Sequence, residues 1–156
     1  MESSAIDEVR KSAEESWASG LLCAESVVLA IAKAEEVESG LLPKIATAFC
    51  SGMGRSCGTC GALTGAIMGV SLALGRSSSN ESLQPSYTAT QRLIQEFEKA
   101  FGSRNCQDLL SGCDLNTPEG QAMFEEQNLN QRCLQFTGKA AEIAARVITE
   151  SKASGR

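Results

Sequence analysis

The residues best suited to chemistry in this chain of 156 residues are seven cysteines, and no histidine accompanies them. The cysteines are Cys23, Cys50, Cys57, Cys60, Cys106, Cys113 and Cys133. Without histidine the chain cannot supply a Ser–His–Asp triad, a Cys–His pair, an imidazole metal ligand or a proximal haem ligand. Any metal bound by this chain would therefore be held by thiolates, with carboxylates as the other available ligands.

Two of the cysteines form a single C-x-x-C motif, Cys57-Gly58-Thr59-Cys60. The motif is not a haem attachment site, because Gly61 stands where a histidine would be required. It is also unlike thioredoxin, whose motif follows a strand, because residues 44–49 have the pattern of a helix. An apolar helix begins directly after the motif, at Gly61. We expect the free N–H groups at that helix start to favour thiolate over thiol.

A glycine-rich turn lies just before the helix and contains Gly52, Gly54 and Gly58, with Gly61 at the helix start. Glycines let backbone N–H groups turn toward a common point, which forms a nest for an anion such as a thiolate-ligated cluster. Phosphate is another anion that such a nest suits, but the P-loop and dinucleotide glycine patterns are absent. Arg55 in this turn could offset the charge of a bound cluster.

Apolar residues recur every three or four positions along most of the chain, which predicts an all-α fold. The expected helices cover residues 4–19, 24–37, 42–49, 61–74, 87–101, a short stretch begun by Thr117 and Pro118, and 132–151. We predict one compact bundle of about six to seven helices over residues 1–152, with a frayed tail at 153–156. Gly61, Gly65 and Gly69 share one face of helix 61–74, so another helix can approach closely and this helix should be central.

Composition excludes several functions. A formal charge of −5 argues against nucleic-acid binding, which needs clustered Lys and Arg. The uncharged run over residues 56–75 is diluted by glycine and has no aromatic belt, so we interpret it as a buried helix and not as a membrane span. The N-terminus lacks the pattern of a secretory signal, which predicts a cytoplasmic protein with reduced thiols. Many cysteines in that compartment indicate metal binding or catalysis.

Four separated elements of the chain, in order, resemble the C-GCAxxG-C-C family of proteins described as redox-active. The elements are Cys23-Ala24-Glu25-Ser26-Val27, Gly52-Met53-Gly54, Cys60-Gly61-Ala62-Leu63-Thr64-Gly65 and Phe101-Gly102-Ser103-Arg104-Asn105-Cys106. The resemblance covers residues 20–133 and maps the four signature cysteines of the family to Cys23, Cys60, Cys106 and Cys133. A related domain occurs in split-Soret cytochromes, which are dimers with haem and an iron–sulfur centre. The resemblance and the glycine face together imply a homodimer, whereas the absence of histidine means that no haem is expected.

The leading hypothesis is a [2Fe–2S] or [4Fe–4S] cluster held by these four cysteines, for electron transfer or redox sensing. Cys57 and Cys113 are candidate extra ligands. One alternative is a thiol–disulfide oxidoreductase in which Cys60 attacks and Cys57 resolves. A second alternative is a structural zinc site with four cysteine ligands. The sequence does not decide between an enzyme and an electron carrier, and it does not identify the redox partner.

Overall fold

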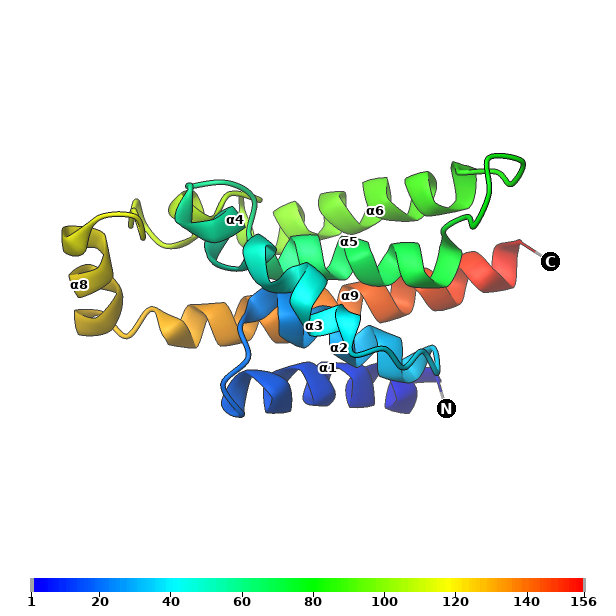
Figure 1. The fold of residues 1–156 in the computed structure, drawn as a ribbon, viewed down its shortest axis with the longest axis horizontal. Coiled ribbons are helices and arrows are strands. Elements are labelled where there is room, and N and C mark those ends of the chain that lie inside the picture. The colour runs from blue at the N-terminus through cyan, green and yellow to red at the C-terminus, as the bar shows by residue number, and fades with distance from the viewer. Residues whose placement is uncertain (1, 156) are drawn as a thin grey trace.

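The computed structural model describes residues 2–155, which form a helical bundle without a β-strand (Figure 1). The elements are α1 (Glu2–Ala18), α2 (Cys23–Ala34), α3 (Leu41–Ala46), η1 (Thr47–Phe49), α4 (Cys50–Arg55), α5 (Gly61–Leu74), α6 (Gln84–Phe101), α7 (Cys106–Leu109), α8 (Pro118–Glu126) and α9 (Asn130–Ser154). Residues 51–54 have left-handed backbone angles, so α4 is a left-handed turn and the other eight α-elements of this part of the chain are right-handed. The prediction of an all-α fold is confirmed.

Five long helices, α1, α2, α5, α6 and α9, make up the body of the bundle (Figure 1). α9 contacts α1, α2, α5 and α6, while α5 contacts α2, α6 and α9. The glycine-rich helix expected at the centre therefore shares that position with α9. In Figure 1, α2, α5 and α9 all begin at the end of the molecule where α4 and α8 lie, and α1 and α6 run toward that end. The first turns of three long helices are thus brought together.

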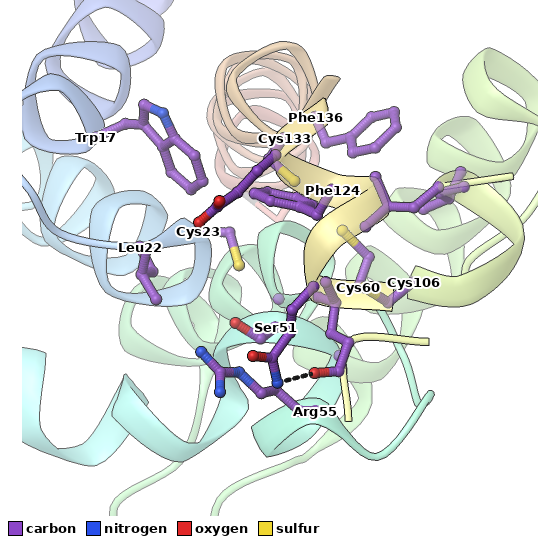
Figure 2. Close-up of a pocket in the computed structure, with 17 residues that line it drawn as sticks. Trp17, Leu22, Cys23, Ser51, Arg55, Cys60, Cys106, Phe124, Cys133 and Phe136 are labelled. Atoms are coloured by element: carbon purple, nitrogen blue, oxygen red, sulfur yellow. Dashed lines mark hydrogen bonds between the residues drawn. The ribbon is translucent and has the colours of Figure 1, made fainter. Parts of the chain in front are cut away.

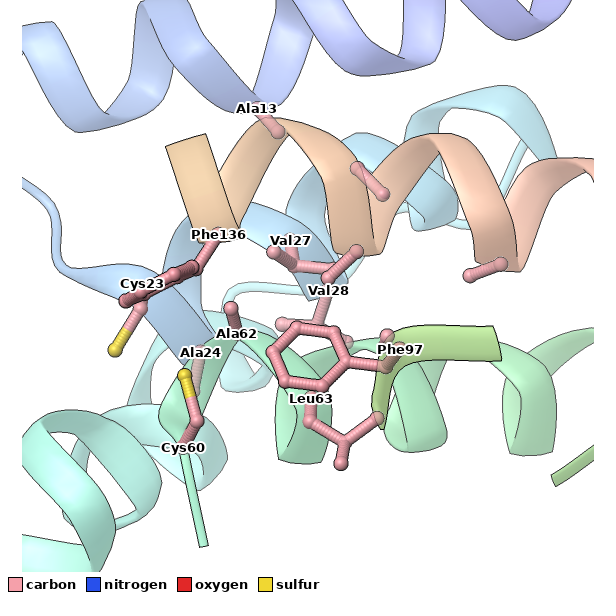
Figure 3. Close-up of a cluster of buried hydrophobic side chains, with 14 of the residues drawn as sticks. Ala13, Cys23, Ala24, Val27, Val28, Cys60, Ala62, Leu63, Phe97 and Phe136 are labelled. Carbon is pink, nitrogen blue, oxygen red and sulfur yellow. The ribbon is translucent and has the colours of Figure 1, made fainter. Parts of the chain in front are cut away.

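The core fills the space between these helices and reaches the first turns of α2 and α5 (Figure 3). Val27 on α2, Leu63 on α5, Leu93 and Phe97 on α6, and Val147 on α9 are completely buried. Burial of an apolar side chain of this size stabilises the fold by about 1.5–3 kcal/mol. Figure 3 shows Cys23 and Cys60 at one edge of this apolar cluster, so the core fixes the two helix ends that carry them.

The glycine face of α5 packs against α2 of the same chain. A Cβ placed on Gly65 would lie 2.6 Å from the carbonyl oxygen and 2.8 Å from the Cα of Ala24. A Cβ on Gly69 would overlap Ile31, and one on Gly61 would overlap the Cys23 sulfur. The small residues therefore serve an intrachain helix contact. The glycine face therefore no longer supports the expected homodimer. The homodimer rests on the family resemblance alone and stays a prediction.

Several expected helix bounds are wrong, although α5 begins and ends at the predicted residues. α1 already includes Glu2 and ends at Ala18, so it begins two residues before the expected range and ends one residue before its limit. α2 ends at Ala34 and not at residue 37, because Glu36 adopts a left-handed φ of 58°. The Val37 N–H then donates to the Ala32 carbonyl at 2.8 Å, which closes the helix in a Schellman-type turn.

The bounds of the later helices also differ from expectation. α6 begins at Gln84, three residues early, because Pro85 is tolerated in a first helical turn. α9 covers Asn130–Ser154, so the tail expected to be frayed from 153 begins as helix, and residue 156 lies outside the described residues. The predicted start of α8 is confirmed, since the Thr117 hydroxyl accepts a hydrogen bond from the Gly120 N–H at 2.9 Å. No helix within residues 2–155 has the length and apolarity that crossing a bilayer requires.

The contact between α5 and α2 can be tested by the Gly65→Ala substitution. The added methyl group would meet backbone atoms, which cannot rotate away, so we expect the free energy of unfolding to fall by about 2 kcal/mol despite the better helix propensity of alanine. Urea unfolding followed by circular dichroism measures this change. Gly40→Ala is the matched control, because a Cβ there meets no atom within 4 Å. Equal stability of the two variants would contradict the close approach.

Candidate functional site

The four signature cysteines lie at the starts of four helices. Cys23 is the first residue of α2, Cys106 is the first residue of α7, Cys60 directly precedes α5, and Cys133 is the fourth residue of α9. All four line one cavity of about 270 Å³ (Figure 2). Residues that are 110 positions apart in sequence meet there because α2, α5 and α9 begin at the same end of the bundle.

The walls of the cavity are mainly apolar and aromatic. Trp17 comes from α1, Phe124 from α8 and Phe136 from α9, as Figure 2 shows. The Phe136 ring also stacks edge-on against Phe101, with centroids 4.8 Å apart, which links the wall to the core. Cys23, Cys60 and Cys106 are each at most 8 % exposed. The sulfur atoms are therefore largely shielded from water.

Glycines make room for two of the cysteines. A Cβ on Gly52 would lie 2.5 Å from the Cys106 Cβ and 3.2 Å from its sulfur. Gly61 leaves space for the Cys23 sulfur in the same way. The Gly58 N–H donates to the Gly52 carbonyl at 3.1 Å and is not free for a ligand. The expectation that Gly58 helps to form an anion-binding nest is therefore wrong.

The segment from Ser51 to Arg55 has an unusual backbone. Ser51, Met53 and Arg55 all have φ values between 56° and 67°, together with Gly52 and Gly54. Left-handed angles at residues with a side chain cost about 1–2 kcal/mol each. The turn carries Ser51, Gly52 and Arg55 into the lining of the cavity (Figure 2), so the strain is stored beside the cysteines. Gly54, which was also expected to support a cofactor, is not among the lining residues.

Backbone hydrogen bonds tie Cys60 to Cys106. The Cys60 N–H donates to the Arg104 carbonyl at 2.8 Å, and the Cys106 N–H donates to the Gly58 carbonyl at 2.9 Å. They form an isolated antiparallel bridge between Thr59 and Asn105. This bridge connects two segments 46 residues apart and fixes the spacing of two cavity cysteines. Sequence reasoning missed this bridge, because a bridge of a single residue pair leaves no alternating pattern of a strand in the sequence.

Burial and not the helix start controls the thiol acidities in the metal-free chain. Burial raises the pKa of Cys60 to about 12, that of Cys133 to about 12 and that of Cys106 to about 11. The backbone N–H groups of Ala62 and Leu63 lower the pKa of Cys60, but their effect is smaller. The helix start favours the Cys60 thiolate as expected, but in the metal-free chain burial outweighs this effect.

The C-x-x-C motif is divided between two environments. Cys57 takes a left-handed φ of 60°, and a hydrogen bond with the Asp114 carboxylate raises its pKa. Cys60 instead interacts with Cys106 and Cys133 across the cavity. The two thiols of the motif therefore have different neighbours, which weakens the alternative in which Cys57 resolves a disulfide formed on Cys60.

Cys113 and Cys50 are buried, and neither lines the cavity. The Cys113 thiol donates to the Gly120 carbonyl at 3.0 Å, which ties it to α8. The Cys50 thiol lies against Cys23, and this hydrogen bond is the main reason that its pKa is raised. Sequence reasoning gave Cys50 no part in the site and missed its contact with Cys23. The proposed extra ligands Cys57 and Cys113 are outside the lining residues.

The donor atoms of the metal-free chain, over its described residues, are not arranged around a single ion. Within residues 2–155, no three side chains of Cys, Asp or Glu come close enough to bind one metal ion. A mononuclear zinc site needs sulfur atoms about 2.3 Å from one centre. The four cysteines line one cavity, but within residues 2–155 they do not form a ready-made site for a single ion.

The raised thiol pKa values predict how stability depends on pH. Below pH about 8.5 these thiols are protonated in both the folded and the unfolded chain. As the pH rises further, the unfolded chain ionises first, so the metal-free protein loses about 1.4 kcal/mol per pH unit for each buried thiol until the folded pKa is reached.

Urea unfolding of the reduced, metal-free protein at pH 7.5 and pH 9.5 measures this loss. Cys133→Ala removes one of the thiols with a raised pKa, so the stability of that variant should fall less over the same interval. Equal stability of the unsubstituted chain at the two pH values would show that these thiols are not buried as described.

Comparison with known proteins agrees with this geometry at the level of the family. Neither the curated proteins nor the solved structures contain a significant match. A family described as "Putative redox-active protein (C_GCAxxG_C_C)" matches residues 21–147, which include all four cavity cysteines. Because the match covers most of the chain, the protein belongs to the C_GCAxxG_C_C family.

Proposed function

We propose that this protein binds an iron–sulfur cluster through Cys23, Cys60, Cys106 and Cys133, and that it serves in electron transfer or redox sensing in the cytoplasm. The observation that carries the proposal is the convergence of these four thiols, from four helix starts, on one cavity of about 270 Å³. Four thiolates are the usual ligand set of both [2Fe–2S] and [4Fe–4S] clusters. The family is described as redox-active, which agrees with this function.

The donor set and its surroundings suit a cluster. The side chains are sulfur donors without imidazole, and soft thiolates favour iron–sulfur clusters, zinc and copper(I). No three of these side chains within residues 2–155 are arranged around one ion, which supports a cluster over a single zinc ion, because cluster ligands bind different iron atoms. The resident group would supply one-electron redox chemistry, and its potential would depend on charge, hydrogen bonds and solvent exposure.

The residues of the chain have separate roles in this proposal. The N–H groups of Ala62 and Leu63, which face the Cys60 sulfur, would stabilise negative charge there. Arg55 lines the cavity and would offset the charge of four thiolates. Trp17 and Phe124 would exclude water from the cavity. At neutral pH, thiols with such high pKa values lose their protons only when a bound metal takes the place of each proton. Cluster binding should therefore release protons.

Iron and sulfide analysis of cysteine variants tests the proposal. Protein purified without air should contain iron and acid-labile sulfide and should show charge-transfer absorption in the visible range. Cys23→Ser and Cys133→Ser should each lose most of the iron and sulfide, because each removes one ligand. Cys113→Ser is the matched control, since it removes a buried thiol outside the cavity, and it should keep both.

Two results would contradict the proposal. Zinc at one ion per chain, without sulfide, would indicate the structural zinc site. Equal iron and sulfide in Cys113→Ser and Cys133→Ser would show that the cavity cysteines are not the ligands.

A further inference from the structure

Cys50 is a fifth thiol beside the cavity and lies against Cys23. The two residues meet at Gly61, where the Cys23 sulfur and the Cys50 backbone lie on either side of the same small space. Both border the point that a Cβ on Gly61 would occupy, which is 3.1 Å from the Cys50 Cα and overlaps the Cys23 sulfur. The Cys50 sulfur also faces the N–H groups of Ala24 and Glu25. Cys50 is thus packed on the first turn of the helix that begins with Cys23.

The two thiols differ in their access to the cavity. Cys23 lines the cavity, whereas Cys50 does not and is only 3 % exposed. The Cys50 thiol donates to the Ala46 carbonyl at 3.7 Å. A molecule that enters the cavity can therefore reach Cys23, while Cys50 lies next to Cys23 outside the lining residues. Such a pair has the layout of an attacking and a resolving cysteine.

We propose that Cys23 and Cys50 form a dithiol site that reacts with small disulfides carrying carboxylate groups, such as glutathione disulfide. The Cys23 sulfur attacks one sulfur of the incoming disulfide, whose S–S bond breaks, and the first small thiol leaves with the Cys23 proton. Cys50 then attacks the Cys23 sulfur, and the second small thiol leaves with the Cys50 proton. Two electrons pass to the incoming disulfide, and one Cys23–Cys50 bond is formed.

Arg55 indicates the charge of the incoming molecule. Arg10, Arg76, Arg92, Arg104, Arg132 and Arg146 each have a hydrogen bond or ion pair with another residue. Among the arginines of the described chain, Arg55 alone has no such side-chain partner within residues 2–155, and it lines the same cavity as Cys23. An unpaired guanidinium at the cavity favours molecules with carboxylates.

This site does not depend on the proposed cluster, because it needs only two thiols of the metal-free chain. The two uses of Cys23 exclude each other, since a cysteine in a disulfide cannot ligate iron. A Cys23–Cys50 bond would therefore withhold one of the four proposed ligands. The core between the long helices lies mostly outside the cavity, so the full chain is expected to stay folded without metal.

Peptide mapping of the metal-free full chain tests the site. Trypsin places Cys23 on peptide 12–33 and Cys50 on peptide 45–55, each as the only cysteine of its peptide. After reaction with glutathione disulfide, we expect these two peptides to be linked and two glutathione molecules to be released per chain. In Cys50→Ser the reaction should stop one step earlier, with one glutathione attached to Cys23.

The controls separate this site from other cysteines. Cys113→Ser removes a thiol as buried as Cys50 but outside the pair, and it should still form the 12–33 to 45–55 link. A link involving peptide 56–76, which contains Cys57 and Cys60, in place of the Cys23–Cys50 link would overturn the proposal. So would full disulfide formation in Cys50→Ser. The helical circular dichroism of each variant verifies its fold, and mapping of the unsubstituted chain tests the pair without any variant.

The preference for carboxylates has its own test. Arg55→Gln should react several-fold more slowly with glutathione disulfide but at an unchanged rate with the neutral bis(2-hydroxyethyl) disulfide. Equal slowing with both reagents would show that Arg55 acts on the shape of the cavity and not through its charge. Neither result involves iron, so failure here leaves the cluster proposal to its own measurements.

Discussion

The close packing of α5 on α2 is the contact on which the rest of the site depends. Gly61, Gly65 and Gly69 lack the side chains that would hold the two helices apart, and Gly61 opens the space taken by the Cys23 sulfur. Each glycine inside a helix costs about 0.5–1 kcal/mol relative to alanine, which the gain in packing must offset. In return, the first turns of both helices meet at one place, and Cys23 and Cys60 lie at those turns.

Burial then determines what the thiols can do. An apolar cavity raises the pKa values of Cys60, Cys106 and Cys133, and the two N–H groups at the start of α5 only partly oppose this effect. A free thiol in this environment is a weak nucleophile at neutral pH, because the thiolate is the reactive form. The same environment suits a metal group, since a positive centre removes the electrostatic cost of ionising the thiols. The cavity is therefore better suited to ligation at these three residues than to catalysis by them.

Sequence patterns predicted the fold better than the details of the site. The 3.6-residue period gave the long helices, and helix 61–74 was predicted to the residue because a glycine-rich turn and Gly75 bound it. The short elements were not predicted. The left-handed turn at Ser51 to Arg55 and the bridge between Thr59 and Asn105 depend on tertiary contacts that leave no periodic pattern in the sequence. The ends of α2 and α6 were misplaced for local reasons, a left-handed Glu36 and a tolerated Pro85.

Sequence reasoning about the individual cysteines was limited in the same way. The family resemblance picked out the four that meet at the cavity, although their linear spacing follows no metal-binding rule. The adjacent motif was misleading, because nearness in sequence suggested that Cys57 works with Cys60, whereas a left-handed φ directs Cys57 toward Asp114. Cys50 belongs to no motif, and only the folded chain shows that it lies against Cys23.

X-ray absorption of protein prepared without air tests the central claim most directly, because it reports the atoms bound to the metal. We predict an iron edge with a first shell of sulfur only and a second shell that contains iron, as expected for a cluster held by four thiolates. A zinc edge, or an iron first shell containing oxygen or nitrogen ligands and no neighbouring iron, would contradict the account.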